Sequence, residues 1–434
     1  MNRRDFLKLP TLLPLAGTAP ALRSEPHHFA DDFVIGTSLD LVIYAPSSRI
    51  ADGGYQTIRS EIDRLRSILD TRDPGSEISL LEHSDATDIS HELQEVLEAY
   101  DYWERRSNGV FSIRPGGAEA PRNVDALGKA YIIDRAAAAA RQAWPTIDAL
   151  LLNVGGDIVT WGQPAEIGVA DPRAWYDNAP PVTTLTVRNG AVATSGTYAR
   201  GAHLADSRTG RAPKAMVAAT VVAADAVTAN ALATTLCVTT VKEGLGLVES
   251  IPGAEALRIE SGVLRRSSGF TRLEQAQGGQ PQPQPAAGSW PPGYRVAMTL
   301  PLTAQGKRPY VAVWVDDASG NLVRGLALWG NKSKYYGDLS TLWNHLHGNF
   351  DQLRSVTRAT RSPGKYELVW DGLDNNKRPV PPGTYRITVE TNQEHGSYAK
   401  QTGTIQIGDS PTTITLPATR NFDAVTVRYG PAQP

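Results

Sequence analysis

The run GAVATSGTYARGAHLADSRTGRAPKAMVAATVVAADAVTANALATTL at residues 190–236 is the most informative part of this chain. Two other distinctive segments precede it, ALGKAYIIDRAA at 126–137 and LLNVGGDIVTWG at 151–162. A glycine pair lets the backbone come close to a ligand, and a T-S-G run offers hydroxyl and amide donors. Taken singly, either feature would more often be a turn.

The composition sets limits on domain number and partners. The chain has 434 residues with 41% hydrophobic content, which is enough for two or three domains with packed cores. A formal net charge of -2 gives no electrostatic reason to expect nucleic acid or an anionic membrane as a partner. The single cysteine, Cys237, lies in an apolar run, so we interpret it as a buried small side chain and expect no internal disulfide.

Residues 1–21 have the pattern of a twin-arginine export signal. Arg3 and Arg4 open RRDFLK, a short apolar stretch follows, and A-P-A at 19–21 has the small-residue pattern of a cleavage site. The apolar stretch is too short and too interrupted by proline to span a membrane. We therefore expect export to the periplasm and no membrane span in the mature chain.

The remaining sequence predicts two domains of different class. Residues 28–272 mix helical and strand patterns, which predicts an α+β domain. Helices are expected at 54–69, 91–106 and 136–143, and strands at 150–154, 165–169, 184–187 and 218–222. Residues 273–293 are rich in Gln, Pro and Gly and predict a linker. Short alternating strands separated by turn residues predict an antiparallel β-sandwich domain at 294–434.

The N-terminal segments resemble the FAD:protein FMN transferase (ApbE) family. The family pattern includes M-G-T, A-K-G-Y-x-x-D, N-x-G-G-D, T-S-G, H-x-x-D-P-x-T-G and D-A-L-A-T, and counterparts occur in this order across residues 33–262. The resemblance implies a flavin-transferase fold that uses FAD as donor and Mg²⁺ as cofactor. It also implies that a protein hydroxyl attacks the phosphorus of the FMN half, that AMP leaves, and that FMN stays on a Thr or Ser of a redox protein.

The same resemblance assigns site residues one by one. His203 corresponds to the base that activates the acceptor hydroxyl, and Gly128, Asn230 and Thr234 correspond to the metal ligands. The implied flavin-binding positions are Thr37, Lys129, Asp134, Gly155, Gly156, Thr194, Ser195 and Gly196. Lys129 is expected to meet phosphate and Asp134 a ribose or adenine edge. The alternative is that Lys129 and Asp134 simply pair with each other.

The chain departs from the family pattern where charge matters. Asn230 replaces the aspartate of D-A-L-A-T, and Ser112 replaces the aspartate of an F-D pair. A neutral amide binds Mg²⁺ more weakly than a carboxylate does. Two alternatives to a transferase follow. One is a non-catalytic flavin-binding or electron-transfer module, and the other is a structural or partner-binding protein in which the β-sandwich is the working part.

The C-terminal domain resembles an uncharacterised periplasmic β-domain family found beside flavin transferases. The resemblance lies in YVAVWVDDASGNLVRGLALW and YELVWDGLDNNKRPVPPGTYRITVE. RSVTRAT at 354–360 partly matches the acceptor motif D-x-x-[ST]-G-A-[ST], which makes Thr360 a candidate for FMN attachment and a plain turn threonine its alternative. The expected partner is therefore a periplasmic redox protein, or this C-terminal domain held close by the linker.

Overall fold

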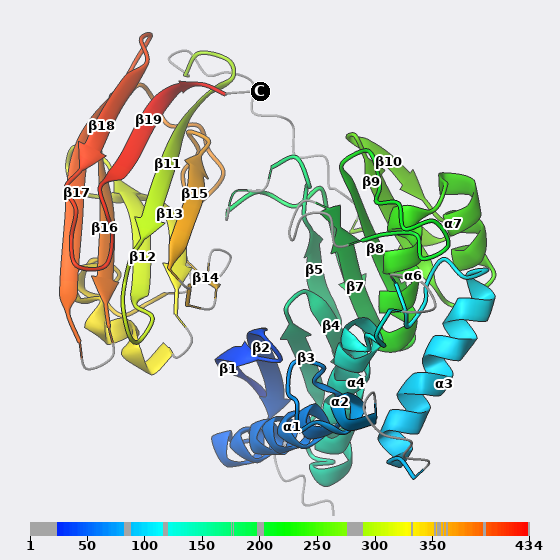
Figure 1. Cartoon of the computed structure of the whole chain (residues 1–434). Coiled ribbons are helices and arrows are strands. Elements are labelled where there is room, and N and C mark those ends of the chain that lie inside the picture. Colours follow the sequence, from blue (N-terminus) through cyan, green and yellow to red (C-terminus); the bar gives the residue numbers. More distant parts are fainter. Residues whose placement is uncertain are drawn as a thin grey trace, which may run out of the picture.

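The computed structural model shows an α+β domain followed by a β-sandwich (Figure 1). It describes residues 24–81, 88–115, 120–174, 176, 178–197, 204–275, 290–330, 333–350, 353, 357–358, 360–361, 363–393 and 396–432. The fold class predicted from the sequence is confirmed for both parts of the chain.

The N-terminal domain is built on an eight-stranded antiparallel sheet of order β1-β2-β3-β4-β7-β8-β9-β10. Its strands are β1 (Glu25–Val34), β2 (Thr37–Ala45), β3 (Ala149–Val154), β4 (Asp157–Trp161), β7 (Gly190–Gly196), β8 (Val217–Ala223), β9 (Glu255–Glu260) and β10 (Val263–Arg266). Strand β8 is buried along its whole length, so both faces of the sheet must be covered there.

Helices cover one face of this sheet and a small hairpin covers part of the other. The helices are α1 (Ser48–Leu69), α2 (Glu77–Leu81), α3 (His91–Arg106), α4 (Asp125–Ala143), α6 (Ala226–Val238) and α7 (Val241–Glu249), and a 3₁₀ turn η1 follows at Phe270–Arg272. Odd-numbered residues of β7 and β8, such as Ala193 and Val221, pack in the helix-side core. Even-numbered residues, such as Val192 and Val222, pack against the hairpin of β5 (Ala165–Val169) and β6 (Thr183–Val187).

The C-terminal domain is a sandwich of two sheets, of orders β15-β11-β19-β18 and β14-β13-β12-β16-β17. The strands are β11 (Tyr294–Leu302), β12 (Tyr310–Asp316), β13 (Leu322–Trp329), β14 (Thr357–Arg358), β15 (Gly364–Trp370), β16 (Gly383–Asn392), β17 (Tyr398–Ile407), β18 (Thr412–Leu416) and β19 (Val425–Pro431). One core joins inward residues of both sheets, including the fully buried Trp329 and Trp370. The outer side of β12 is covered by η2 (Ser333–Asp338) and α8 (Ser340–His345).

The two domains meet in at least one defined contact. The side chain of Asn178 donates to the carbonyl of Val369 at 2.8 Å and accepts from its N–H at 2.9 Å. The guanidinium of Arg295 lies over the ring of Tyr176, 6.0 Å from its centroid. The two domains are therefore joined by contacts as well as by the chain.

The segment between the domains is shorter than the predicted linker at 273–293. The backbone of Gln275 donates to Thr184, and Leu273 accepts from Thr186, so these residues extend the edge of β6. Trp290 packs edge-on against Trp370 inside the sandwich. Residues at both ends of the predicted linker thus belong to the domains, and 276–289 lie outside the described residues.

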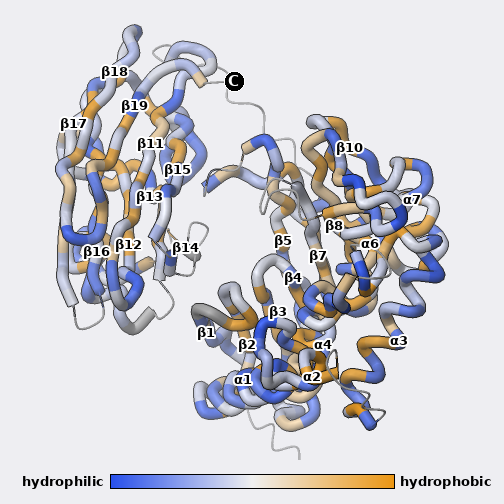
Figure 2. The backbone as a smooth tube through the Cα atoms, viewed as in Figure 1, coloured by the Kyte–Doolittle hydropathy of each residue, from blue (hydrophilic) through white to orange (hydrophobic). Residues whose placement is uncertain are grey.

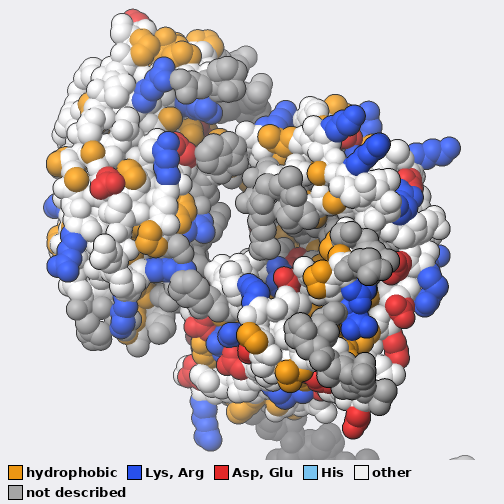
Figure 3. All heavy atoms as spheres, viewed as in Figure 1, with side chains coloured by type: hydrophobic (Ala, Val, Ile, Leu, Met, Phe, Trp, Pro, Cys, Tyr) orange, Lys and Arg blue, Asp and Glu red, His pale blue; other side chains and the backbone are white. Residues whose placement is uncertain are grey.

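Apolar residues gather in the strands at the centre of each domain (Figure 2). On the face drawn in Figure 3, positive and negative side chains are interspersed. None of the helices in the described ranges is long and apolar enough to cross a membrane.

Candidate functional site

Two tight turns lie side by side at one end of the sheet. Ile35 and Gly36 connect β1 to β2, and Gly155 and Gly156 connect β3 to β4, all four with positive φ. Such pairs form the hairpin turns that match strand twist. A Cβ on Gly155 would lie only 2.5 Å from the Oγ1 of Thr37, so this position has room for glycine alone. The predicted residues Thr37 and Gly155 are therefore brought together.

A buried ion pair lies next to these turns, on the helix side of the sheet. The Nζ of Lys129, on α4, lies 2.6 Å from a carboxylate oxygen of Asp157, the first residue of β4. The side chains are only 14% and 6% exposed. Removing two charges from water is costly unless they pair closely, so this short contact is what allows both to be buried here.

Asn230, on α6, completes this arrangement. Its Nδ2 faces both carboxylate oxygens of Asp157, at 3.5 and 3.4 Å. Turning the amide over would place its oxygen against the carboxylate, so the donor must face Asp157. The Oδ1 consequently points elsewhere, and it is buried without a hydrogen-bond partner among the described residues. A buried acceptor without a donor calls for a ligand atom, an ion or water.

Thr234 lies one helical turn after Asn230 and contacts the neighbouring strand. Its Oγ1 is 3.2 Å from the Oγ of Ser195 on β7. Positions i and i+4 share a face of a helix, so Asn230 and Thr234 both face the sheet. We call Lys129, Asp157, Ser195, Asn230 and Thr234 the polar cluster.

Thr194 is separated from the polar cluster by the sheet itself. Neighbouring residues of a strand point to opposite faces, and Thr194 has the orientation of Val192, on the hairpin side. Its Oγ1 lies 2.9 Å from that of Thr220 on β8. Gly196, at the end of β7, is buried. Of the predicted T-S-G run, Ser195 alone presents its side chain to the polar cluster.

Asp134 contacts backbone rather than Lys129. Its carboxylate accepts hydrogen bonds from the N–H groups of Ala226 and Val227, at the start of α6. Burial, together with the nearby negative charge of Asp225, raises the pKa of Asp134 to about 7. The expected alternative, a pair between Lys129 and Asp134, does not form because Lys129 is paired with Asp157.

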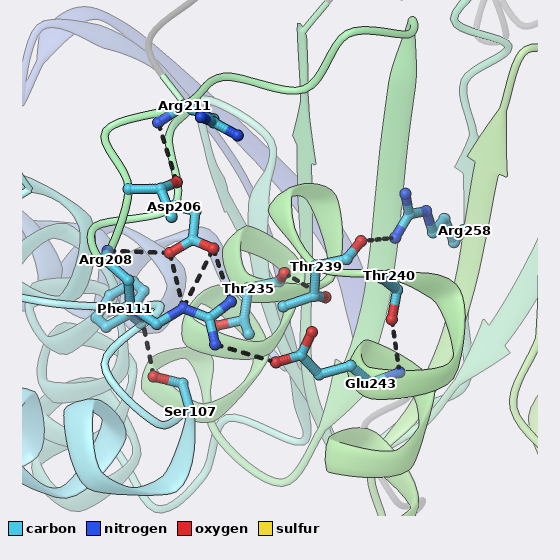
Figure 4. A network of polar contacts seen from close by, with 11 residues as sticks. Ser107, Phe111, Asp206, Arg208, Arg211, Thr235, Thr239, Thr240, Glu243 and Arg258 are labelled. Atoms are coloured by element: carbon cyan, nitrogen blue, oxygen red, sulfur yellow. Dashed lines mark hydrogen bonds and ion pairs between the residues drawn. The ribbon is translucent and has the colours of Figure 1, made fainter.

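The chain immediately after residue 203 is firmly anchored (Figure 4). Arg208 binds the carboxylate of Asp206, at 2.7 Å, and reaches Glu243 of α7 at 3.4 Å. The Arg208 guanidinium lowers the pKa of Asp206, so this carboxylate stays charged. His203 itself lies outside the described residues, but its position is three residues before this anchored turn.

Thr360 is buried in the C-terminal domain, with 4% of its surface exposed. A hydroxyl that carries a phosphoester-linked flavin must reach solvent or a donor site. The burial of Thr360 argues against flavin attachment in this conformation and favours the structural alternative.

The oxygen atoms of the predicted metal site suit a hard cation, although they are neutral. Gly128 is buried in the first turns of α4, directly before Lys129, and Asn230 offers the unpartnered Oδ1. Carbonyl, amide and hydroxyl oxygens are ligands that Mg²⁺ accepts, with phosphates and water completing its shell. Within the described ranges, no group of three or more His, Cys, Asp or Glu side chains could hold a metal ion. The donor set fits Mg²⁺ with weak protein ligation.

Asp157 is the residue that our site prediction omits. It ends the N-x-G-G-D segment, whose glycines we singled out, and it connects Lys129 to Asn230. The signal was present in that motif, because an acidic residue directly after a glycine turn begins the next strand with its side chain near the turn.

The fold and the site together define an α+β domain with a buried polar cluster beside two tight turns, joined to a β-sandwich. The ApbE family matches residues 35–119 and 117–258, and a family described as a predicted periplasmic protein (DUF2271) matches residues 294–424. The chain belongs to the ApbE family.

Solved structures of similar proteins cover the N-terminal domain. The ApbE protein of Thermotoga maritima is 22% identical, with a TM-score of 0.50, and covers 58% of this chain and 100% of its own. The flavin transferase ApbE of Vibrio cholerae is 18% identical, with a TM-score of 0.49, and covers 58% and 99%. The flavinyl transferase ApbE of Pseudomonas stutzeri has 16% identity, a TM-score of 0.49 and coverage of 58% and 99%. A search of curated proteins finds no match.

Proposed function

We propose that this protein is an FAD:protein FMN transferase that acts in the periplasm. Membership of the ApbE family and the flavin-transferase names of similar structures support this proposal. The observation that carries it is the buried, unpartnered Oδ1 of Asn230 beside the Lys129–Asp157 pair. Buried acceptors normally have a donor, so this oxygen is available to a ligand atom, an ion or water.

In the proposed reaction, the polar cluster receives the pyrophosphate of FAD. Lys129 supplies positive charge near the phosphate oxygens, and Asp157 holds Lys129 and Asn230 in place. Mg²⁺, when bound by Asn230, Thr234 and the carbonyl of Gly128, would polarise the pyrophosphate.

The transfer itself exchanges one phosphorus–oxygen bond for another. The acceptor hydroxyl oxygen bonds to the phosphorus of the FMN half, and the bond from that phosphorus to the AMP phosphate oxygen breaks. The hydroxyl proton passes to His203, and AMP leaves. The product is FMN joined by a phosphoester to a Thr or Ser of a redox protein.

The export route and the acceptor complete the proposal. The family description of the C-terminal domain supports a periplasmic location, and the Arg3–Arg4 signal supports the twin-arginine route. Because Thr360 is buried, we propose a separate redox protein as the acceptor rather than the chain's own C-terminal domain.

A second function is favoured by one specific observation. Asn230 is neutral, and Asp157 already neutralises Lys129, so the polar cluster carries no spare negative charge for a cation. A protein of this kind could hold flavin without transferring it. Retention of FAD without transfer would identify such a flavin-binding module.

The test is transfer to an acceptor peptide that carries the D-x-x-[ST]-G-A-[ST] motif. The mature protein is mixed with FAD, Mg²⁺ and the peptide, and the intact mass of both is measured. We expect an FMN-sized gain on the peptide and none on the enzyme. His203→Ala should lower the transfer rate by about 10²-fold to 10⁴-fold, the usual contribution of a general base.

The matched control is His91→Ala, because His91 is exposed on α3 and 76% of its side chain is accessible. It should transfer FMN at the wild-type rate. Retained FAD with no mass gain on the peptide would contradict the transferase and leave the flavin-binding module. A gain on the enzyme at Thr360 would instead show that the C-terminal domain opens.

Asn230→Asp is expected to make the stability of the protein depend on Mg²⁺. In the wild type, the Asn230 amide lies 3.4 Å from a carboxylate oxygen of Asp157. In the variant without a cation, two carboxylates would face each other at this place, and their like charges repel. With Mg²⁺ the added charge strengthens ligation, so affinity should rise by about tenfold or more. Thermal unfolding with and without MgCl₂ measures both effects.

Asn189→Asp is the matched control for this substitution. It adds the same charge at an exposed turn, where the Asn189 side chain accepts from the N–H of Gly162. Its melting temperature should respond to Mg²⁺ as the wild type does. Equal responses from Asn230→Asp and Asn189→Asp would contradict a cation site at Asn230.

A further inference from the structure

Helix α6 begins under two carboxylates that come from different parts of the chain. Asp225, the residue before the helix, accepts from the N–H of Thr228 at 2.7 Å. Asp134, on α4, accepts from the N–H of Ala226 at 2.8 Å and more weakly from Val227 at 3.4 Å. The first three N–H groups of α6 are therefore all bound by side-chain oxygens.

These bonds matter because α6 is buried along most of its length. Nine of its residues are buried, and its polar face is the one that carries Asn230 and Thr234. The first N–H groups of a helix have no partner within the helix, and water reaches a buried end poorly. Negative charge at this end also interacts favourably with the helix dipole.

The opposite end of α6 is held in a complementary way. Arg258, which is 4% exposed, donates to the carbonyls of Leu236 at 2.8 Å and Thr239 at 2.6 Å (Figure 4). A cation at the C-terminal end and carboxylates at the N-terminal end leave the helix little freedom to slide along its axis.

We propose that Asp134 is a positioning residue for the flavin site, holding α6 against α4 so that Asn230 stays against the Lys129–Asp157 pair and Thr234 against Ser195. The inference rests on the proposed function. It follows from connectivity, because Asp134 lies on the same helix as Gly128 and Lys129. One side chain thus fixes the relative position of the two helices that contribute to the polar cluster.

This role differs from direct contact with FAD. Both carboxylate oxygens of Asp134 accept from the start of α6, so neither is directed to a ribose or adenine edge. Among the described residues, the negative charges of Asp225 and, more weakly, Asp157 raise the pKa of Asp134. Two carboxylates close together repel each other. The hydrogen bonds that Asp134 accepts from the start of α6 explain why an acidic residue is placed there despite this repulsion.

Titration of Asp134 should make the stability of the start of α6 depend on pH. Burial and Asp225 raise its pKa to about 7, well above the value in an unfolded chain. The native state therefore binds the proton more tightly than an opened state does. Stability from this group is present in acid and is lost as pH rises from about 4 to about 7. Opening of the α6 end should accordingly become easier across that range.

The experiment measures hydrogen exchange of peptides covering 226–238, corrected for the chemical rate, together with FAD affinity on the full mature chain. Asp134→Ala should speed exchange at the start of α6 by about tenfold and weaken FAD binding in proportion. Asp134→Asn keeps an acceptor oxygen and should restore both. It should also remove the pH dependence of exchange between pH 5 and 8, which changes in the wild type by about tenfold or more.

Thr240→Ala is the matched control, because Thr240 caps α7, which carries no residue of the polar cluster. It should leave exchange in 226–238 and FAD affinity unchanged. Weaker FAD binding by Asp134→Ala with unchanged α6 exchange would overturn the inference in favour of direct contact. Faster exchange with unchanged FAD affinity would show that Asp134 stabilises the fold but does not position the flavin site. A wild-type protein that binds no FAD overturns the proposed function, and this role with it.

Discussion

Replacing Asp157 with alanine is expected to lower the free energy of unfolding by about 3 to 5 kcal/mol, the usual cost of removing one partner of a buried ion pair. Lys129, whose side chain is only 14% exposed, would lose the carboxylate that lies 2.6 Å from its Nζ and would remain as an unpaired buried charge. Asn230 would lose the acceptor that fixes its orientation. Retention of FAD should be lost as well, because Lys129 and Asn230 are the residues proposed to meet the pyrophosphate.

Chemical denaturation of Asp157→Ala and of the double variant Lys129→Met/Asp157→Ala separates the two effects. Removing both charges should recover most of the stability, since an unpaired buried charge is the main cost. The double variant should still fail to retain FAD. Asp171→Ala, which breaks the more exposed pair with Arg173, should cost much less than Asp157→Ala. An Asp157→Ala protein as stable as that control would show that the Lys129 pair does not support the fold.

Replacing Arg258 with methionine is expected to cost about 3 kcal/mol of stability. Methionine keeps the apolar stem but removes the guanidinium, so the carbonyls of Leu236 and Thr239 lose their donors at the end of α6. Both carbonyls lie where the helix provides no N–H, and a buried acceptor without a donor is costly.

The midpoint of urea unfolding, followed by far-ultraviolet circular dichroism, measures this loss. Arg265→Met on the neighbouring strand is the control, because Arg265 is exposed and makes only a long contact with the carbonyl of Leu264. It should shift the midpoint little. If the two variants unfold at the same urea concentration, the Arg258 contacts contribute nothing measurable to α6.

The sequence predicted helices and strands where apolar spacing was regular. Ile58, Ile62 and Leu65 follow the helical period and all lie in the core. The structure begins this helix earlier, at Ser48, because Gly53 and Gly54 leave space for Trp144 and Ile147. Gly53 and Gly54 are helical despite the low helix propensity of glycine, because close packing favours the helix there. In the sandwich, Val425, Val427 and Tyr429 of β19 follow the strand alternation and all lie in the core.

Site residues were predicted from sequence motifs, but in the structure neighbouring residues of one motif lie on different faces of the sheet. Ser195 and Thr194 are adjacent in the sequence, yet alternation along β7 sends them to opposite faces. The partner of Lys129 could not be read from helical spacing, because Asp157 comes from another element and is brought close only by packing of α4 on the sheet. Short-range patterns therefore do not identify the tertiary partner of a side chain.

The contact between Asn178 and Val369 has a consequence for self-association. Strand β15 is the outermost strand of its sheet, so its unpaired backbone groups could template a foreign strand. The amide of Asn178 imitates a peptide unit and occupies both the N–H and the carbonyl of Val369. A strand from another molecule would have to displace the N-terminal domain before it could add there. At this residue the α+β domain therefore covers the edge of the sheet against pairing with another molecule.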